Sequence, residues 1–269
     1  MRLPFIKMHG LGNDFIVLDG RITRLPAMTS NAVKQLADRR EGIGCDQLIL
    51  LEPSQVSDFR MRIFNSDGGE VEACGNASRA VALLHGKKAM VETDGGLIAL
   101  EPADGGASVD MGAPRFDWDA IPLAYAMDTS AMPVGWDELT TPMAVNVGNP
   151  HAIFFVDDPH AVDLETLGPV IETDPLFAQG VNVNVASLNS PNRLTLRVWE
   201  RGAGLTRACG TGACATGVAA IAKGLVTSPV TVSLPGGDLE IAWERGGTIR
   251  MTGPATESFR GEFEWEDYA

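Results

Sequence analysis

Short apolar runs, most of them bounded by glycine, proline or charged residues, follow one another along the chain. Runs of this length that are rich in valine, isoleucine, leucine and phenylalanine are typical of β-strands. On this pattern we expect strands within residues 4–10, 16–19, 48–53, 59–65, 90–102, 106–112, 143–150, 152–158, 180–188, 193–200, 230–243 and 247–253. Glycine pairs inside two of the longer runs indicate hairpins that turn at those positions.

Helical patterns are few in comparison. Residues 30–39 carry apolar positions at helical spacing, with Ser30 as the expected N-cap. A weaker helical pattern covers residues 163–171, and two alanine-rich helical segments begin directly after Cys74 and Cys209. Because strand runs outnumber helices, and because each alanine-rich helix is apolar enough to need strands around it, the pattern predicts an α+β protein.

The order of elements occurs twice. A strand end, a glycine-bearing turn, a cysteine and a helix of small residues follow one another in 64–84 and again in 199–222, with Cys209 lying 135 positions after Cys74. The same offset places Asn182 on Gln47 and Glu200 on Asn65. The chain therefore reads as two copies of one unit, each with a cysteine at the start of its main helix.

We expect two pseudo-symmetric domains, residues 1–117 and 118–255, with the C-terminal segment 256–269 able to return to the first. Each domain is expected to be a strongly curved, mostly antiparallel sheet or barrel around a central helix, with the active site in the cleft between the domains. Residues 113–141, which are rich in proline and tryptophan, have no counterpart in the repeat and are interpreted as a linker.

Composition narrows the class of protein. The 269 residues are 45% hydrophobic, which suits two packed cores. A net charge of −14 excludes nucleic acid as an expected partner, because phosphate binding relies on clustered lysine and arginine. No apolar run approaches the roughly 20 residues of a membrane span, and the N-terminus lacks a signal-peptide core. We therefore expect a cytoplasmic protein that does not bind membranes.

The four cysteines, Cys45, Cys74, Cys209 and Cys214, contain no Cys-x-x-Cys pair. In a cytoplasmic chain they are expected to be thiols and not disulfides. The four histidines form no ligand cluster with them, so we expect no zinc or other metal site.

Cys74 and Cys209 occupy the positions where a thiol is most easily activated. At a helix N-terminus the first backbone N–H groups have no intrahelical partner and the helix dipole favours negative charge. Such a site binds anions and is expected to lower a thiol pKa from its unperturbed value of roughly 8.5. A single cysteine of this kind is more often a packed residue than a base, but the matched positions in two copies favour function. Cys45 and Cys214 lack that match and are interpreted as core residues.

Six segments of the chain resemble the diaminopimelate epimerases, a family of cofactor-independent amino-acid racemases and epimerases. They are KMHGLGNDF at 7–15, RREGIGCDQ at 39–47, FNSDG with ACGN at 64–76, VGNPH at 147–151, GVNV at 180–183 and WERGAGLTRACGTGACA at 199–215. They extend over nearly the whole chain in the family's order. One departure is Ala77-Ser78 after CGN, where the family usually has glycine first.

The resemblance implies an isomerase that interconverts LL- and meso-2,6-diaminopimelate, in lysine and peptidoglycan precursor biosynthesis, without cofactor or metal. Inverting an α-carbon requires one group to remove its proton and another to return a proton on the opposite face, and the family match assigns these roles to Cys74 and Cys209. The implied substrate-binding residues are Asn13, Gln47, Asn65, Gly75, Asn76, Asn149, Asn182, Glu200, Arg201, Gly210 and Thr211. His151 and Glu200 are implied to tune the cysteines, and the family is usually homodimeric.

Three alternatives stay open at this point. A related racemase or epimerase of histidine, proline or hydroxyproline would keep both cysteines and differ in substrate. An isomerase of the phenazine-biosynthesis type would keep the fold, but that type lacks the cysteine pair. A thiol-redox protein would cycle Cys74 and Cys209 as a disulfide.

Overall fold

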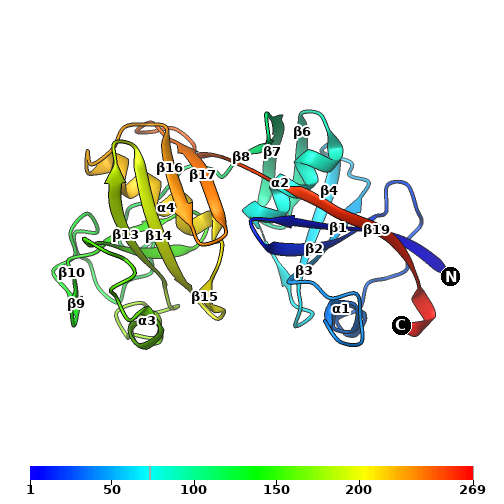
Figure 1. Cartoon of the computed structure of the whole chain (residues 1–269), viewed down its shortest axis with the longest axis horizontal. Coiled ribbons are helices and arrows are strands. Elements are labelled where there is room, and N and C mark those ends of the chain that lie inside the picture. The colour runs from blue at the N-terminus through cyan, green and yellow to red at the C-terminus, as the bar shows by residue number, and fades with distance from the viewer. Residues whose placement is uncertain (73, 269) are drawn as a thin grey trace. The chain divides into compact units, whose positions relative to one another are not determined.

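The computed structural model describes residues 1–72 and 74–268, and the chain divides into two compact units (Figure 1). Unit 1 consists of Met1–Val109 and Gly253–Ala269, and unit 2 of Asp110–Thr252. None of the helices in the described residues is long and apolar enough to cross a membrane.

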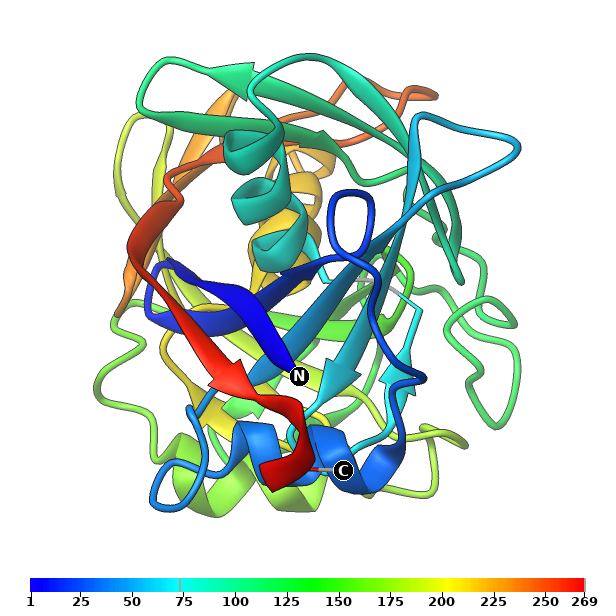
Figure 2. The ribbon, with the colours of Figure 1, turned by 90° about the vertical axis from the view of Figure 1, so that its right-hand side faces the viewer.

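Unit 1 is a curved sheet with two helices. Its strands are β1 (Arg2–Gly10), β2 (Asn13–Asp19), β3 (Gln47–Glu52), β4 (Phe59–Asn65), β5 (Glu70–Val71), β6 (Ala89–Thr93), β7 (Gly96–Ala103), β8 (Gly106–Asp110) and β19 (Thr256–Glu264), and its helices are α1 (Ser30–Ala37) and α2 (Gly75–His85), with a short 3₁₀ turn at Trp265–Asp267. Most neighbours are antiparallel, but β2 pairs with β3 and β4 with β6 in parallel. Figure 2 shows α2 with strands of this unit around it.

Unit 2 has the same plan. Its strands are β9 (Gly135–Trp136), β10 (Leu139–Thr140), β11 (Met143–Asn146), β12 (Pro150–Phe155), β13 (Asn182–Ser190), β14 (Arg193–Glu200), β15 (Gly204–Thr206), β16 (Val230–Leu234), β17 (Gly237–Ala242) and β18 (Arg250–Gly253), and its helices are α3 (Leu164–Glu172) and α4 (Gly210–Ala222). As in unit 1, two pairs are parallel, β12 with β13 and β14 with β16.

The two parallel pairs stand at equivalent places in the two units. β2 and β3 flank α1 in the chain, as β12 and β13 flank α3, and β4 and β6 enclose α2, as β14 and β16 enclose α4. The register also matches, because Gln47 lies opposite Phe15 in unit 1 as Asn182 lies opposite His151 in unit 2. This confirms the predicted α+β fold of two pseudo-symmetric units.

The two central helices are buried along most of their length because they are built from small residues. All but three of the thirteen residues of α4 are buried, and the first eight residues of α2 are buried as well. A helix with no polar face must be covered on every side. The small side chains of alanine and glycine let the surrounding strands approach it closely. Each cysteine at a helix start is therefore held at the end of a rigid, enclosed element.

The linker predicted for residues 113–141 is wrong. Ile121, Met132 and Leu139 are fully buried in the core of unit 2, and Arg115 pairs with Asn146 through backbone hydrogen bonds. β9 and β10 form a hairpin within this stretch. The apolar residues of this segment are spaced too irregularly for the sequence to predict a helix or a strand. In the structure they pack against one side of the sheet formed by β11, β12 and β13.

Two smaller expectations need correction or completion. The N-cap of α1 is Thr29 and not Ser30, because Thr29 has the extended backbone and its hydroxyl accepts the Ala32 N–H. The C-terminal segment closes unit 1, since β19 pairs with β1 along its length. Phe263 is buried in that core, with Trp265 packed against it.

Candidate functional site

Cys74 lies at the N-cap of α2, where its extended backbone (φ −148°, ψ 111°) turns into the helix. Its thiol lies 3.9 Å from the Asn13 side-chain oxygen, which also accepts a 3.1 Å hydrogen bond from the Asn76 amide. Unit 1 thus brings three of the predicted site residues together. Cys74 is half-buried, and Ala77, three residues further along the chain in α2, is a fully buried core residue.

Asn13 is held in place by a charged network that sequence reasoning missed. Its amide nitrogen donates to Asp46 (2.9 Å), and Asp46 is paired with Arg39 (2.7 Å). Arg39 also donates hydrogen bonds to both carboxylate oxygens of Asp14. The Lys7 ammonium nitrogen lies 2.6 Å from one of these oxygens. Burial alone would raise the pKa of Asp14, but the hydrogen bonds from Arg39 and Lys7 outweigh it and hold that pKa well below its usual range.

We expect Asp14→Asn to lower the free energy of unfolding at neutral pH by about 2 kcal/mol, less than for fully buried pairs because Arg39 is 56% exposed. Since the pKa of Asp14 is lowered by folding, its contribution is present above its unfolded value of about 3.9 and is lost as the pH falls below it. The variant should therefore lose less stability on acidification than the wild type does. Urea unfolding at several pH values measures both effects.

The matched control is Asp238→Asn, which removes the carboxylate of an exposed surface pair with Arg193. We expect it to change the unfolding free energy by about 0–1 kcal/mol. Equal effects of the two substitutions would contradict the role given to the Asp14 network.

Asn76 has a second support, the buried Arg79. This side chain is fully buried in the middle of α2 and donates to the Asn76 oxygen (2.8 Å) and to the backbone carbonyl of Pro254. An arginine inside a helix of small residues was a signal in the sequence that could have been followed. Its effect is to fix the amide of Asn76 so that its nitrogen faces Asn13.

Gln47 and Asn65 lie opposite each other on β3 and β4, and the Gln47 amide donates to the Asn65 oxygen (3.0 Å). The side-chain oxygen of Gln47 is buried and has no hydrogen-bond partner among the described residues. Burying a hydrogen-bond acceptor without a partner costs free energy. The side-chain oxygen of Gln47 is therefore a candidate to accept an N–H group of a ligand.

Cys209 lies at the N-cap of α4, as Cys74 does at α2. The Gly212 N–H donates to its sulfur (3.2 Å), and the Thr211 hydroxyl lies 3.5 Å away. The expected lowering of its pKa is nevertheless wrong. Burial, with the side chain only 2% exposed, and the nearby charge of Glu200 raise the pKa of Cys209 well above its ordinary value, and the helix-end hydrogen bonds offset only part of this.

Glu200 is the charged group that Cys209 faces. Burial raises the pKa of Glu200, while hydrogen bonds from the Thr206 hydroxyl and from Cys209 oppose that rise. Neighbouring residues in a strand point to opposite faces of the sheet. Because β14 ends at Glu200, this rule does not apply to the next residue, Arg201. The Arg201 backbone N–H donates to Asn182, whose amide in turn donates to the carbonyl of Pro150.

His151 is fully buried on β12, and its ring nitrogens contact two asparagines. Nδ1 lies 3.0 Å from the side-chain oxygen of Asn184, and Nε2 lies 3.0 Å from the side-chain oxygen of Asn149. Burial lowers the pKa of His151 to about 4, so the ring is neutral at physiological pH. The groups that shift the Cys209 pKa are Glu200, Thr211 and Gly212, whereas His151 is bonded to the two asparagines.

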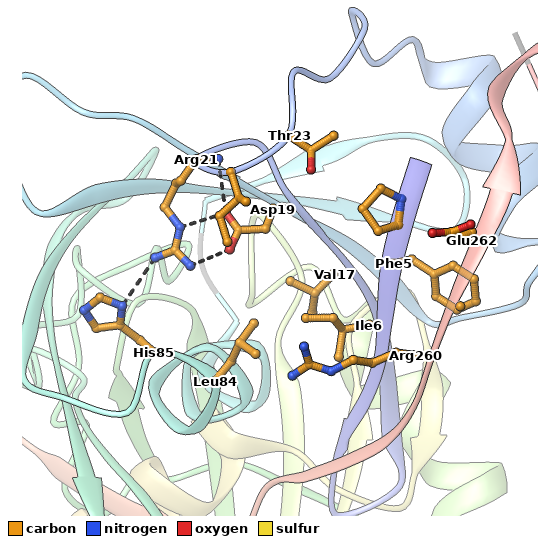
Figure 3. A pocket seen from close by; sticks show the side chains of 13 residues that line it. Phe5, Ile6, Val17, Asp19, Arg21, Thr23, Leu84, His85, Arg260 and Glu262 are labelled. Carbon is orange, nitrogen blue, oxygen red and sulfur yellow. Dashed lines mark hydrogen bonds and ion pairs between the residues drawn. The ribbon is translucent and has the colours of Figure 1, made fainter. Parts of the chain in front are cut away.

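The other cysteines and two of the histidines take no part in the contacts described above. Cys45 and Cys214 are buried core residues, and burial raises the pKa of Cys45 to about 12. His160 is exposed, whereas His85 is half-buried against the Phe59 ring and accepts a hydrogen bond from Arg21. Figure 3 shows His85 and Arg21 beside a pocket of about 630 Å³ in unit 1. Within the described residues no group of three or more His, Cys, Asp or Glu could hold a metal ion.

Comparison with known proteins identifies the family. The family model described as diaminopimelate epimerase matches residues 5–116 and 143–257. A diaminopimelate epimerase from Erythrobacter litoralis (strain HTCC2594) is 68% identical over 269 residues, covering all of both chains. One from Sphingopyxis alaskensis is 64% identical over 264 residues, covering 98% of each.

Among solved structures, a phenazine biosynthesis protein of the PhzF family from Enterococcus faecalis has the same fold. Its TM-score is 0.73 at 14% identity, and the match covers 98% of this chain and all of that one. At this identity the likeness concerns the fold alone. On the family match and the sequence identities, the chain belongs to the diaminopimelate epimerase family.

Proposed function

We propose that this chain interconverts LL- and meso-2,6-diaminopimelate by moving a proton between the two faces of the α-carbon. The observation that carries the proposal is the pair of N-cap cysteines, Cys74 and Cys209, at equivalent positions of two matching units in a member of this family. The other two cysteines stand elsewhere, because Cys214 lies inside α4 and Cys45 lies in the loop before β3.

In the proposed mechanism, one cysteine as thiolate takes the α-proton and the other as thiol gives its proton to the opposite face. The proton count balances, because the first cysteine ends as a thiol and the second as a thiolate, ready for the reverse reaction. The raised pKa of Cys209 suits the thiol, which is the proton donor. The backbone N–H groups at the starts of α2 and α4 are proposed to bind the substrate carboxylate as negative charge moves into it.

The polar side chains of the site are proposed to bind the amino and carboxylate groups of the substrate. Glu200 is an acceptor for an ammonium group, and Arg201 is a donor for a carboxylate. The buried, unpartnered oxygen of Gln47 is proposed to accept an N–H group of the ligand. The other proposed contacts are Asn13, Asn65, Gly75, Asn76, Asn149, Asn182, Gly210 and Thr211.

We also propose that the enzyme works without a cofactor, as a homodimer, in the cytoplasm, where free thiols such as those of Cys45 and Cys209 persist. The dimer proposal is supported by Phe259, which stands 52% exposed on β19. Sedimentation of the purified chain, alone and with Phe259→Lys, tests it. A monomer at micromolar concentration would contradict it.

The function is tested with the purified, reduced chain and LL-diaminopimelate, followed by chiral chromatography with no cofactor added. We expect the meso isomer to form until the LL and meso isomers reach equilibrium. Conversion of proline, hydroxyproline or histidine, with diaminopimelate left untouched, would overturn the substrate assignment and keep the type of reaction.

A further inference from the structure

The carboxylate of Glu172, the last residue of α3, bridges the two sides of the turn that follows β14. This helix packs against β13, β14 and β15 (Figure 1). Oε2 of Glu172 accepts the indole N–H of Trp199 (2.7 Å), and Oε1 accepts the backbone N–H of Gly202 (2.8 Å). Glu200 and Arg201, two of the expected substrate-binding residues, lie between these donors in the chain. One carboxylate therefore holds the chain on both sides of this pair.

The backbone of Glu172 brings a second segment to the same place. Its carbonyl oxygen accepts the N–H of Val181, the residue before β13 (3.3 Å). A Cβ atom at Gly180 would lie 3.2 Å from that carbonyl oxygen and 3.1 Å from Cδ of Arg201, so a glycine at this position, with φ +70°, lets these groups approach closely. The Arg201 guanidinium donates through Nη1 to the carbonyl of Gln179 (2.8 Å). The end of α3 thus holds the segment before β13 against the Arg201 side chain.

One face of α3 supplies both a seat for the Trp199 ring and its hydrogen-bond acceptor. Residues four positions apart lie on the same face of a helix, as Gly168 and Glu172 do. A Cβ atom at Gly168 would lie 2.4 Å from the Trp199 ring, closer than two non-bonded carbon atoms can approach. The lack of a side chain at Gly168 therefore lets the ring lie on the helix backbone, where its N–H reaches Glu172.

The fold itself does not require this carboxylate. A negative charge at the C-terminal end of a helix is opposed by the helix dipole, and Glu172 is the last residue of α3. In unit 1 the 135-residue offset places Ala37 at the position of Glu172 and Phe64 at that of Trp199. Both are buried in one apolar cluster of the core. The same architecture therefore forms in unit 1 with hydrocarbon in place of the carboxylate and the indole N–H.

We propose that Glu172 is a positioning residue for substrate binding: by holding Trp199 and Gly202, it fixes the backbone from which Arg201 binds a carboxylate group of the substrate. Arg201 is exposed, and holding its backbone in place reduces the conformational freedom that binding has to remove. The part of this statement that concerns the substrate rests on the proposed function. The bridge itself does not, because it follows from contacts within unit 2.

The first test is Glu172→Gln, which keeps the size of the side chain and removes one accepting oxygen. The Trp199 indole and the Gly202 N–H can only donate, so the amide nitrogen of the glutamine must face one of them. We expect KM for LL-diaminopimelate to rise about tenfold, as for the loss of one hydrogen bond to a charged group. We expect kcat to stay within about twofold of the wild type, because Glu200 keeps its hydrogen bond from the Thr206 hydroxyl.

The matched control is Glu165→Gln, which removes the same charge from an exposed residue in the first turn of α3. Its KM should equal that of the wild type. An unchanged KM in Glu172→Gln, or an equal rise in the two variants, would overturn the proposal, because the bridge would then make no contribution of its own.

A second substitution separates positioning from packing. Trp199→Phe keeps an aromatic ring beside Gly168 and removes the indole N–H. In the double variant Glu172→Gln/Trp199→Phe, the amide can turn its oxygen to the Gly202 N–H and its nitrogen to the ring, so that no two donors face each other. We expect KM of the double variant to be about threefold lower than that of Glu172→Gln alone. Losses that add would contradict the proposal and assign both side chains to packing.

The bridge is tested without substrate by the rate at which trypsin cuts the folded protein after Arg201, followed by mass spectrometry. Proteases cut backbone that opens locally, so release of one end of the bridge should speed this cut about tenfold in Glu172→Gln. The rate in Glu165→Gln should stay at that of the wild type. An unchanged rate in Glu172→Gln would overturn the proposal whether or not the chain acts on diaminopimelate. A faster cut with an unchanged KM would overturn the role of the bridge in substrate binding.

Discussion

Cys74→Ala and Cys209→Ala each lower the rate of epimerisation by about 10³-fold, the range found when a general acid or base is removed. The reason is that inversion needs a group on each face of the α-carbon, and no neighbouring side chain can replace a missing thiol on its own face. The rate is measured with reduced protein and LL-diaminopimelate by chiral chromatography. Both variants should keep the thermal midpoint of the wild type within a few degrees.

The matched control is Cys45→Ala, which removes a thiol that is 2% exposed in the core of unit 1 and whose pKa is raised to about 12. We expect its turnover to match that of the wild type. If either of the two N-cap variants kept more than a tenth of the wild-type rate, the assignment of that cysteine would be wrong.

Glu200→Gln lowers the pKa of Cys209 and lowers kcat/KM by about 100-fold, the loss expected for a charged hydrogen bond to an ammonium group. Burial is the largest cause of the raised pKa of Cys209, and the charge of Glu200 raises it further, so removal of that charge should let the thiolate form at lower pH. The two effects are separable. Titration of ¹³Cβ-labelled cysteine by NMR follows the pKa, and steady-state kinetics follows substrate binding.

Glu172→Gln is the control for this substitution. Glu172 lies in the same unit and accepts hydrogen bonds from the Trp199 indole on β14 and from the Gly202 N–H in the turn after it. It is not among the groups that shift the pKa of Cys209. We expect the titration of Cys209 to stay as in the wild type. A rise in the pKa of Cys209 in Glu200→Gln would contradict the electrostatic role given to Glu200.

The repeat could be predicted from the sequence because its signals are local. The small residues after each cysteine and the apolar runs concern neighbours in the chain, and the repeat appears when two such local patterns are found 135 residues apart. They were enough to place most of the strands, the two central helices and the two N-cap cysteines, but not β5, β9, β10, β15 and β19. Residues 113–141 were misread as a linker because their apolar side chains are buried against β11–β13. These contacts join distant parts of the chain and leave no periodic pattern in the segment itself.

The environment of the site could not be predicted in the same way. The pKa of Cys209 depends on its burial and on Glu200, and the helix-end effect that the sequence reveals is the smaller contribution. Asp46 and Asn184 were missed because their partners lie 33 and 28 residues away, at Asn13 and Gly212. Such supporting contacts are set by tertiary structure, whereas the residues that they support stand in recognisable motifs.

The two-base mechanism is tested most directly by the first turnovers of LL-diaminopimelate in D₂O, with the α-positions of substrate and product analysed separately by NMR and mass spectrometry. Two opposed thiols predict that the meso product carries one deuterium at the inverted carbon while the remaining substrate still carries hydrogen, because the proton is removed on one face and a solvent-derived one is returned on the other. Product that keeps the substrate's own hydrogen would mean that a single group serves both faces and would contradict the roles assigned to Cys74 and Cys209.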